Sequence, residues 1–354
     1  MNIVFANNLR VILHDTPNKI EKLINKEMSK HVVVDKNFTE GEILFEIKFK
    51  EKIKVNKTSK YISLLALFND EDTYILDNMG NKFSYNPIYK EFLVEKRFNE
   101  SYFFEILEYI FMNKILEKDL MFLHSSSFTY KNKTYVFPAC NNTGKTKVLL
   151  EFLEWGAEFL GDDWVIIDKD CNAYPYFRNI RLYPNDVIEH KKMIKDWKIQ
   201  PKFLHNYFDD SKEIKSLKIL KKIYEKILLY KRILPYILNV DSYSKRIRYF
   251  DNRKIDLVVF YSRNNIDKIE HTFIDSETVA KKMVYAILNE NTKKPDFENW
   301  FLFANENEND KRKYFETKYL EIMKEAFSKS KIIWLQIPKI AKPDEIAKYL
   351  IEVK

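Results

Sequence analysis

The chain contains few glycines and cysteines and no long hydrophobic run. Of its 354 residues, 5 are glycine and 2 are cysteine. Cys140 and Cys171 provide neither a disulfide framework nor a zinc-binding spacing, and the N-terminus lacks the basic and apolar regions of a signal peptide. The longest apolar run, near ISLLALF, is far shorter than the roughly 20 residues that a bilayer requires. The sequence therefore predicts a globular, cytoplasmic protein without a membrane span.

Positive charge is concentrated in one segment. The formal net charge is +8, and residues 211–254 contain 13 Lys or Arg against 4 Asp or Glu. This segment accounts for the whole net charge, and the rest of the chain is near neutral. A solvated helical face is the simplest interpretation. A cover over an acidic peptide or a nucleotide is a second one, and a nucleic-acid surface, with tyrosines among the basic residues, is a third.

The chain is predicted to have two parts. Residues 1–100 carry strand patterns such as EILFEIKFK, in which apolar and polar residues alternate, and predict a smaller N-terminal α+β domain. A helical stripe over 101–118 leads into residues 101–354, where strands and helices alternate. Within this second part, apolar residues recur at helical spacing over 214–228, so a basic helical insertion is expected at about 186–250.

The region before and after residue 140 predicts a strand, a loop, a helix and another strand. SSFTY and KTYVFP are expected to form strands joined by a tight turn at 131–133. A helix should follow from Lys145 to about Trp155, with Gly156 as its C-terminal cap. AEFLGDD and WVIID then predict a buried strand that is interrupted at Gly161. Later, KIDLVVFYSR and KIIWLQI predict strands, and SETVAKKMVYAIL and KPDEIAKYLIEV predict helices. The expected fold class is α/β with a mixed sheet, α+β overall.

The loop in this region has part of the sequence of a phosphate-binding loop. The pattern G-x-x-x-x-G-K-[ST] is met by the GKT of 144–146, but Ala139 replaces its first glycine. In such a loop, backbone N–H groups at the start of a helix hold phosphates, and the helix contributes about half a positive charge. Asn141 and Asn142 tolerate a left-handed backbone better than most residues. A functional loop is therefore physically feasible without that glycine.

Two adjacent acids follow the loop at a suggestive distance. Asp162 and Asp163 come 17 and 18 residues after Lys145, far enough for one helix and one returning strand. One acid beside a phosphate loop can hold Mg²⁺, and another can take a proton from an attacking hydroxyl. A solvated turn before Trp164 is an equally supported interpretation.

Residues 123–168 resemble the nucleotide-binding core of the HPr kinase/phosphorylase superfamily, which shares an unusual P-loop fold with phosphoenolpyruvate carboxykinase. In that group a strand histidine precedes the loop, a hairpin leads into it, and the next strand ends in Asp-Asp. The residues that match in one register are His124, Lys145, Thr146, Asp162 and Asp163.

The resemblance implies an ATP- and Mg²⁺-dependent kinase that transfers the γ-phosphoryl group to a hydroxyl of a protein, a peptide or a small molecule. It implies that Thr146 and Asp163 hold Mg²⁺, that Asp162 is the general base, and that His124 lies close to the transferred phosphoryl group with Lys145. The residues expected to bind the nucleotide are Asn141, Asn142, Thr143, Gly144, Lys145, Thr146 and Lys147.

Two further features leave alternatives open. Arg178 and Arg181 are candidates for contacts with phosphate or with the acceptor, and solvated surface arginines are the other interpretation. The altered loop also fits a nucleotide-binding partner protein that has lost catalysis. The basic segment 211–254 fits a kinase that acts on RNA. An oligomer is compatible with each of these hypotheses.

Overall fold

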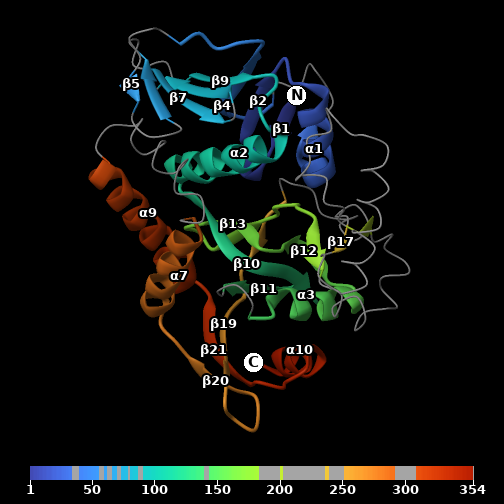
Figure 1. The fold of residues 1–354 in the computed structure, drawn as a ribbon. Helices are drawn as coiled ribbons and strands as arrows, with labels where there is room; N and C mark the ends of the chain where they lie inside the picture. The colour runs from blue at the N-terminus through green and yellow to red at the C-terminus, as the bar shows by residue number, and fades with distance from the viewer. Residues whose placement is uncertain are drawn as a thin grey trace.

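Two large β-sheets and one small sheet form the framework of the protein (Figure 1). The computed structural model describes residues 1–33, 40–55, 60–61, 66–69, 73–78, 80–86, 91–138, 143–182, 200–201, 236–238, 251–291 and 308–353. Among these residues, no helix combines the length and the apolar character needed to cross a membrane. Helices together with two mixed sheets confirm the expected α+β class.

The first sheet is built from the N-terminal residues, in the order β3-β1-β2-β4-β9-β8-β7-β6-β5. The predicted alternation is confirmed in β4, where Phe45, Ile47 and Phe49 are buried. The ends of β7 and β8 pair at Asn78 and Asn81, so these two strands form a hairpin. The strands are β1 (Asn2–Val4), β2 (Arg10–His14), β3 (Val32–Val33), β4 (Ile43–Lys50), β5 (Lys60–Tyr61), β6 (Ala66–Asn69), β7 (Thr73–Asn78), β8 (Asn81–Asn86) and β9 (Glu91–Glu95).

Helix α2 (Glu100–Lys114) lies between the two large sheets, and α1 (Asn18–Met28) packs against it (Figure 1). The Asn99 side chain caps α2 by accepting a hydrogen bond from the Tyr102 N–H. Seven apolar residues of α2 are buried, and they belong to one core with Phe122 and Ile166 of the second sheet. The boundary expected near residue 100 therefore falls at the start of a helix that both sheets cover.

The second sheet has the order β18-β14-β13-β10-β11-β19-β21-β20, with β12 also paired to β10. Strands β11, β19 and β21 are parallel to one another, whereas β10 is antiparallel to β11, so the sheet is mixed as expected. The strands are β10 (Leu120–Tyr130), β11 (Lys133–Pro138), β12 (Glu158–Gly161), β13 (Trp164–Asp168), β14 (Asn172–Tyr174), β18 (Arg253–Lys254), β19 (Leu257–Asn264), β20 (Glu270–Phe273) and β21 (Lys331–Pro338).

Helices flank this sheet on either side in Figure 1. Helix α3 (Lys145–Glu154) packs with α10 (Pro343–Glu352), and α7 (Ser276–Asn291) packs with α9 (Glu308–Ser328). The helix predicted from Lys145, the helices predicted at SETVAKKMVYAIL and KPDEIAKYLIEV, and the strands predicted at SSFTY, KTYVFP, AEFLGDD, WVIID, KIDLVVFYSR and KIIWLQI are confirmed. Helix α9 is an additional helix. The 131–133 turn is confirmed as well, since Lys131 and Asn132 both have positive φ angles, as a tight hairpin turn requires.

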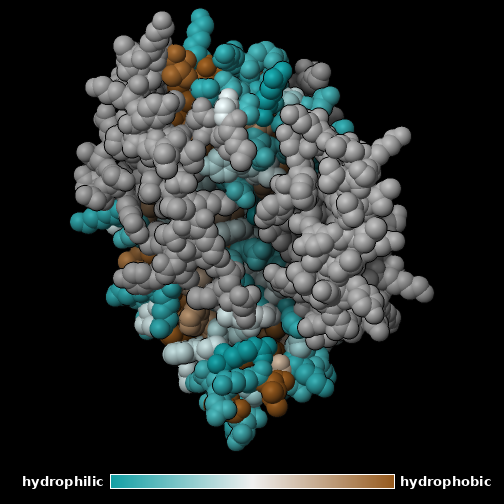
Figure 2. All heavy atoms as spheres, in the orientation of Figure 1, coloured by the Kyte–Doolittle hydropathy of each residue, from teal (hydrophilic) through white to brown (hydrophobic). Residues whose placement is uncertain are grey.

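Most of the predicted basic helical insertion, including its stripe over 214–228, lies outside the described residues. Within 186–250 the structure describes only β16 (Gln200–Pro201) and β17 (Tyr236–Leu238), which are strands. They pair with each other, and β17 also pairs with β15 (Ile180–Leu182). On the face drawn in Figure 2, the described surface is mostly hydrophilic, with small separate hydrophobic patches.

Candidate functional site

The predicted phosphate loop joins β11 to α3. Strand β11 ends at Pro138 and α3 begins at Lys145, but residues 139–142, which include Asn141 and Asn142, lie outside the described part of the chain. Gly144 precedes the helix with a φ of 96°, a conformation that favours glycine. The first turn of α3 carries no acidic side chain. Its N–H groups and the positive end of its dipole are therefore not offset by an acid of the helix itself.

The acid pair occupies a break between two strands that both lie along β10. The first half of β10 pairs with β13, and its second half pairs with β12. Asp163 adopts a left-handed φ of 64°, and its carbonyl accepts a hydrogen bond from the Ser125 N–H at 3.1 Å. A Cβ at Gly161 would lie 2.2 Å from the Trp164 carbonyl oxygen, so the turn needs glycine there. The glycine before the acids thus permits the turn that carries them.

Asp162 is buried against the start of α3. Its carboxylate oxygens accept hydrogen bonds from the Thr146 hydroxyl at 3.1 and 3.0 Å, and one of them also accepts from the Ser126 hydroxyl at 2.5 Å. Only 6% of Asp162 is exposed. Burial, and secondarily the charge of Asp163, raise the pKa of Asp162 to about 6, although these hydroxyl groups favour the ionised form. Asp162 is therefore an acid whose pKa lies close to neutral pH.

Lys145 and His124 form a buried pair beside the loop. The Lys145 ammonium lies 3.1 Å from His124 Nε2, which in turn lies 3.9 Å from Asp163 Oδ1. The Asp163 side chain is 54% exposed. Desolvation opposes its ionisation, but the hydrogen bond and charge of His124, with other basic side chains, outweigh that effect and lower its pKa. Asp163 thus stays ionised and reaches solvent.

The five residues that carry the resemblance converge in space. They come from β10, from the first turn of α3 and from the break between β12 and β13. The Thr146 hydroxyl contacts Asp162, whereas Asp163 lies near His124 and has a left-handed backbone. The expected sharing of Mg²⁺ between Thr146 and Asp163 stays a prediction.

Comparison with models of protein families and with curated proteins finds no match for this chain. The geometry of the site is therefore the basis for assigning a function.

The oxygen atoms at the site fit a Mg²⁺ ion that is shared with phosphate groups. Among the described residues, no group of three or more His, Cys, Asp or Glu side chains could hold a metal by itself. Mg²⁺ usually takes one or two carboxylates and completes its shell with water and substrate phosphates. The hydroxyl of Thr146 and the carboxylates of Asp162 and Asp163 supply such ligands.

The two candidate arginines have different surroundings. Arg178 Nη1 lies 3.0 Å from Glu108 Oε1, and the guanidinium group lies over the Phe104 ring, 5.4 Å from its centroid. Burial opposes the charge of Arg178, but Glu108 together with Tyr176, Glu27 and Asp163 outweighs that effect and raises the pKa of Arg178. Arg178, which follows β14, is thus paired with an acid of α2.

Arg181 belongs to β15, opposite Ile237, and its side chain lies outside the described part. The expected contacts of these arginines with phosphate stay predictions.

Two residues near the loop were not identified from the sequence. A Cβ at Gly144 would lie 3.4 Å from Arg263 Nη2 and 3.7 Å from the Tyr261 hydroxyl. Arg263 Nη1 is fixed by the carbonyls of Pro338, Lys339 and Ala341, at 3.3, 2.9 and 3.4 Å. Both residues lie toward the carboxyl end of β19, which is parallel to β11. The carboxyl ends of parallel strands lie at the same edge of a sheet, so these two side chains lie near the loop that follows β11. The polar and aromatic residues FYSR near the end of the predicted strand could have indicated them.

Proposed function

We propose that the protein is an ATP- and Mg²⁺-dependent kinase that transfers the γ-phosphoryl group to a hydroxyl-bearing acceptor. The acceptor is a serine of a protein or peptide, or a small molecule. One observation carries the proposal: the Thr146 hydroxyl, at the start of a helix that follows a strand and loop, contacts a buried acid on the returning strand. A lysine, a hydroxyl and an acid in this arrangement are the groups that P-loop enzymes use to hold the phosphates and Mg²⁺.

Binding of the triphosphate is assigned to the start of α3. Its backbone N–H groups would hold the phosphates, with Lys145 reaching the β and γ groups. Arg263 Nη2 lies beside Gly144 and adds a second cation at this edge. Thr146 and the ionised Asp163, with Asp162 adjacent, would hold Mg²⁺, which when bound neutralises charge on the phosphates.

The general base is assigned to Asp162. A base works best when its pKa lies near the operating pH, and the pKa of Asp162 is raised to about 6. Its carboxylate is ionised above that pH and can take the proton of an acceptor hydroxyl. Asp163 has a lowered pKa and is the weaker base of the pair.

Two variants test the proposal. Lys145→Ala should abolish nucleotide-dependent phosphorylation, whereas Asp162→Asn should bind ATP·Mg²⁺ in calorimetry yet fail to transfer phosphate. Asp267→Asn, an exposed acid elsewhere, is the matched control. Retained transfer in Asp162→Asn would overturn the base assignment. Nucleotide binding by the unaltered protein without turnover on any acceptor would favour a binding protein that has lost catalysis.

RNA is one of the acceptors to include in such a screen. The basic segment 211–254 that motivates it lies almost entirely outside the described residues. Binding to RNA through this segment should weaken steeply as salt is raised, because counterions are released from the phosphates. A flat response to salt would remove RNA from consideration.

A further inference from the structure

A pocket of 490 Å³ opens at the edge of the second sheet opposite the phosphate loop. Lys133, the first residue of β11, and Lys331, the first residue of β21, both line it. Its volume is in the range of small-molecule sites. The lining residues are Lys133, Tyr135, Lys254, Ile255, Asp256, Leu257, Ser328, Lys329, Ser330, Lys331 and Val353.

The lining carries an excess of positive charge. Four lysines contribute to it, against Asp256 as the one acid of the lining, and Asp170 and Glu325, outside the lining, pair with Lys329. The Asp256 carboxylate accepts a hydrogen bond from the Thr134 N–H at 2.8 Å, at the start of strand β11. No ion pair joins Asp256 to any of the four lysines within the described part of the chain. The acid therefore offsets only part of the positive charge.

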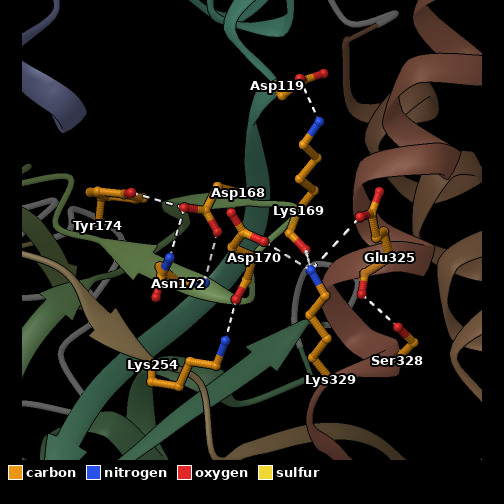
Figure 3. Close-up of polar contacts among 10 residues, drawn as sticks. All are labelled: Asp119, Asp168, Lys169, Asp170, Asn172, Tyr174, Lys254, Glu325, Ser328 and Lys329. Carbon is orange, nitrogen blue, oxygen red and sulfur yellow. Dashed lines mark hydrogen bonds and ion pairs between the residues drawn. The ribbon is translucent and has the colours of Figure 1, made fainter.

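Two of the lysines are held in place by Asp170 (Figure 3). Lys254 donates to the Asp170 carbonyl oxygen, and Lys329 donates to a carboxylate oxygen of Asp170 and to the Lys169 carbonyl, each at 2.9 Å. These contacts bring β18 and the residue after α9 to the same turn. Binding of a ligand to these ammonium groups costs less side-chain entropy, because the two lysine side chains are already held in place.

The other two lysines have no acidic partner among the residues that the structure describes. Lys133 and Lys331 are exposed, and neither makes an ion pair with a described residue. Their backbones are fixed, since β11 and β21 both pair with β19 between them. Ammonium groups gathered around one pocket repel one another, and a bound anion would remove that repulsion. Tyr135 and Leu257 belong to the apolar part of the pocket wall.

We infer that this pocket binds a small polyanion that carries two or more phosphate or carboxylate groups. Lys133 and Lys331 supply charge that no described acid pairs with, and Lys254 and Lys329 also line the pocket. The pocket and the phosphate loop lie at opposite ends of β11, from Lys133 to Pro138. Both can therefore be occupied at once, and the inference does not depend on kinase activity.

Titration calorimetry of the full chain with inorganic pyrophosphate, at low salt and without Mg²⁺, tests this inference. We expect Lys133→Gln/Lys331→Gln to weaken binding about tenfold, since each exposed lysine contributes a modest ionic contact. Lys22→Gln/Lys268→Gln removes the same charge from exposed positions elsewhere and should bind as the unaltered protein does. Citrate in a parallel titration distinguishes a site for carboxylates from one for phosphates.

Lys145→Ala separates this pocket from the phosphate loop. The inference requires that Lys145→Ala still binds pyrophosphate and that the Lys133/Lys331 substitution weakens the binding in that background as well. Loss of binding in Lys145→Ala alone would place the anion in the loop and overturn the inference. An equal loss in the Lys22/Lys268 control would show only general attraction to positive charge, and no binding of either anion would also contradict it.

Discussion

The Thr146 hydroxyl donates to both carboxylate oxygens of Asp162, at 3.1 and 3.0 Å. This contact joins the first turn of α3 to the residue directly after β12. Asp162 is buried there beside a second acid, and burial, followed by the charge of Asp163, raises the pKa of Asp162 to about 6 despite this hydrogen bond. The activity and the stability of the protein should both depend on this carboxyl group.

The pH profile of phosphoryl transfer should report the ionisation of Asp162. We expect kcat/KM to rise about tenfold per pH unit below about pH 6 and to level off above it, because only the ionised acid accepts a proton. Since the charge of Asp163 helps to raise this pKa, Asp163→Asn should move the midpoint to lower pH. Initial rates over a pH series measure both. A profile without an acid limb would contradict the role of Asp162.

Asp162→Asn should stabilise the protein while it removes activity. Because the folded-state pKa is raised, the native state binds more protons than the unfolded state between pH 3.8 and about 6. Wild-type stability therefore falls as pH rises through this window. Asn avoids that cost, so we expect the free energy of unfolding at pH 7 to increase by about 3 kcal/mol.

Urea unfolding at pH 7 and below pH 4 measures this effect. The gain should disappear at the lower pH, where the wild-type acid is protonated in both states. The exposed substitution Asp267→Asn should show no gain at either pH. An Asp162→Asn variant that is less stable than wild type at pH 7 would contradict the interpretation.

His31 should make the fold sensitive to acid. Its Nδ1 lies 2.8 Å from the Val4 carbonyl oxygen, its Nε2 accepts from the Phe177 N–H at 2.9 Å, and burial lowers its pKa to about 4. Between pH 6.5 and about 4, His31 thus binds a proton in the unfolded state but not in the native state. Stability from this residue, present above pH 6.5, should fall by about 3 kcal/mol as pH falls through the window.

Urea unfolding from pH 7 to pH 4 tests the role of His31. His31→Gln should lose this part of the pH dependence, because glutamine does not titrate. His14→Gln is the control, since His14 is 41% exposed and contacts Glu46. The same slope in wild type and His31→Gln would show that other groups cause the acid sensitivity.

Arg263 should contribute to nucleotide affinity. Its Nη2 lies beside Gly144, while Nη1 is held by three carbonyl groups. Arg263→Gln should raise the Kd for ATP·Mg²⁺ about tenfold, as expected for loss of one charged contact with phosphate. Arg263→Lys should not restore the affinity for ATP·Mg²⁺, because a lysine ammonium cannot bond to the carbonyls and the phosphate in this geometry. Arg253→Gln is the matched control in calorimetry, and an unchanged Kd in Arg263→Gln would contradict the assignment.

The local parts of the site could be predicted because short-range rules determine them. Gly156 has a φ of 86°, as a helix cap needs, and Gly161 permits the turn that the two acids occupy. The hairpin before the loop follows from its turn residues. These features depend on the backbone conformation of a few neighbouring residues. The types and spacing of those residues in the sequence indicate that conformation.

The long-range parts could not be predicted from patterns of this kind. Arg263 reaches Gly144 only because β19 pairs in parallel with β11, and strand periodicity does not specify a neighbour. Arg178 forms an ion pair with Glu108 of α2, a residue 70 positions earlier in the chain. Thr146 contacts Asp162 and not Asp163, and Asp163 has a left-handed backbone, which is uncommon for a residue other than glycine. Spacing in the sequence specifies neither feature.

The placement of α2 has a consequence for any attempt to divide the protein. Seven apolar side chains of this helix are buried, in a core shared by the first sheet and by Phe122 of β10, two residues before His124. A fragment that begins at residue 101 would expose that helix face to water and leave the base of β10 unsupported. The strand that carries His124 and Ser126 therefore depends on the first hundred residues for its shape, and both halves should melt as one cooperative unit.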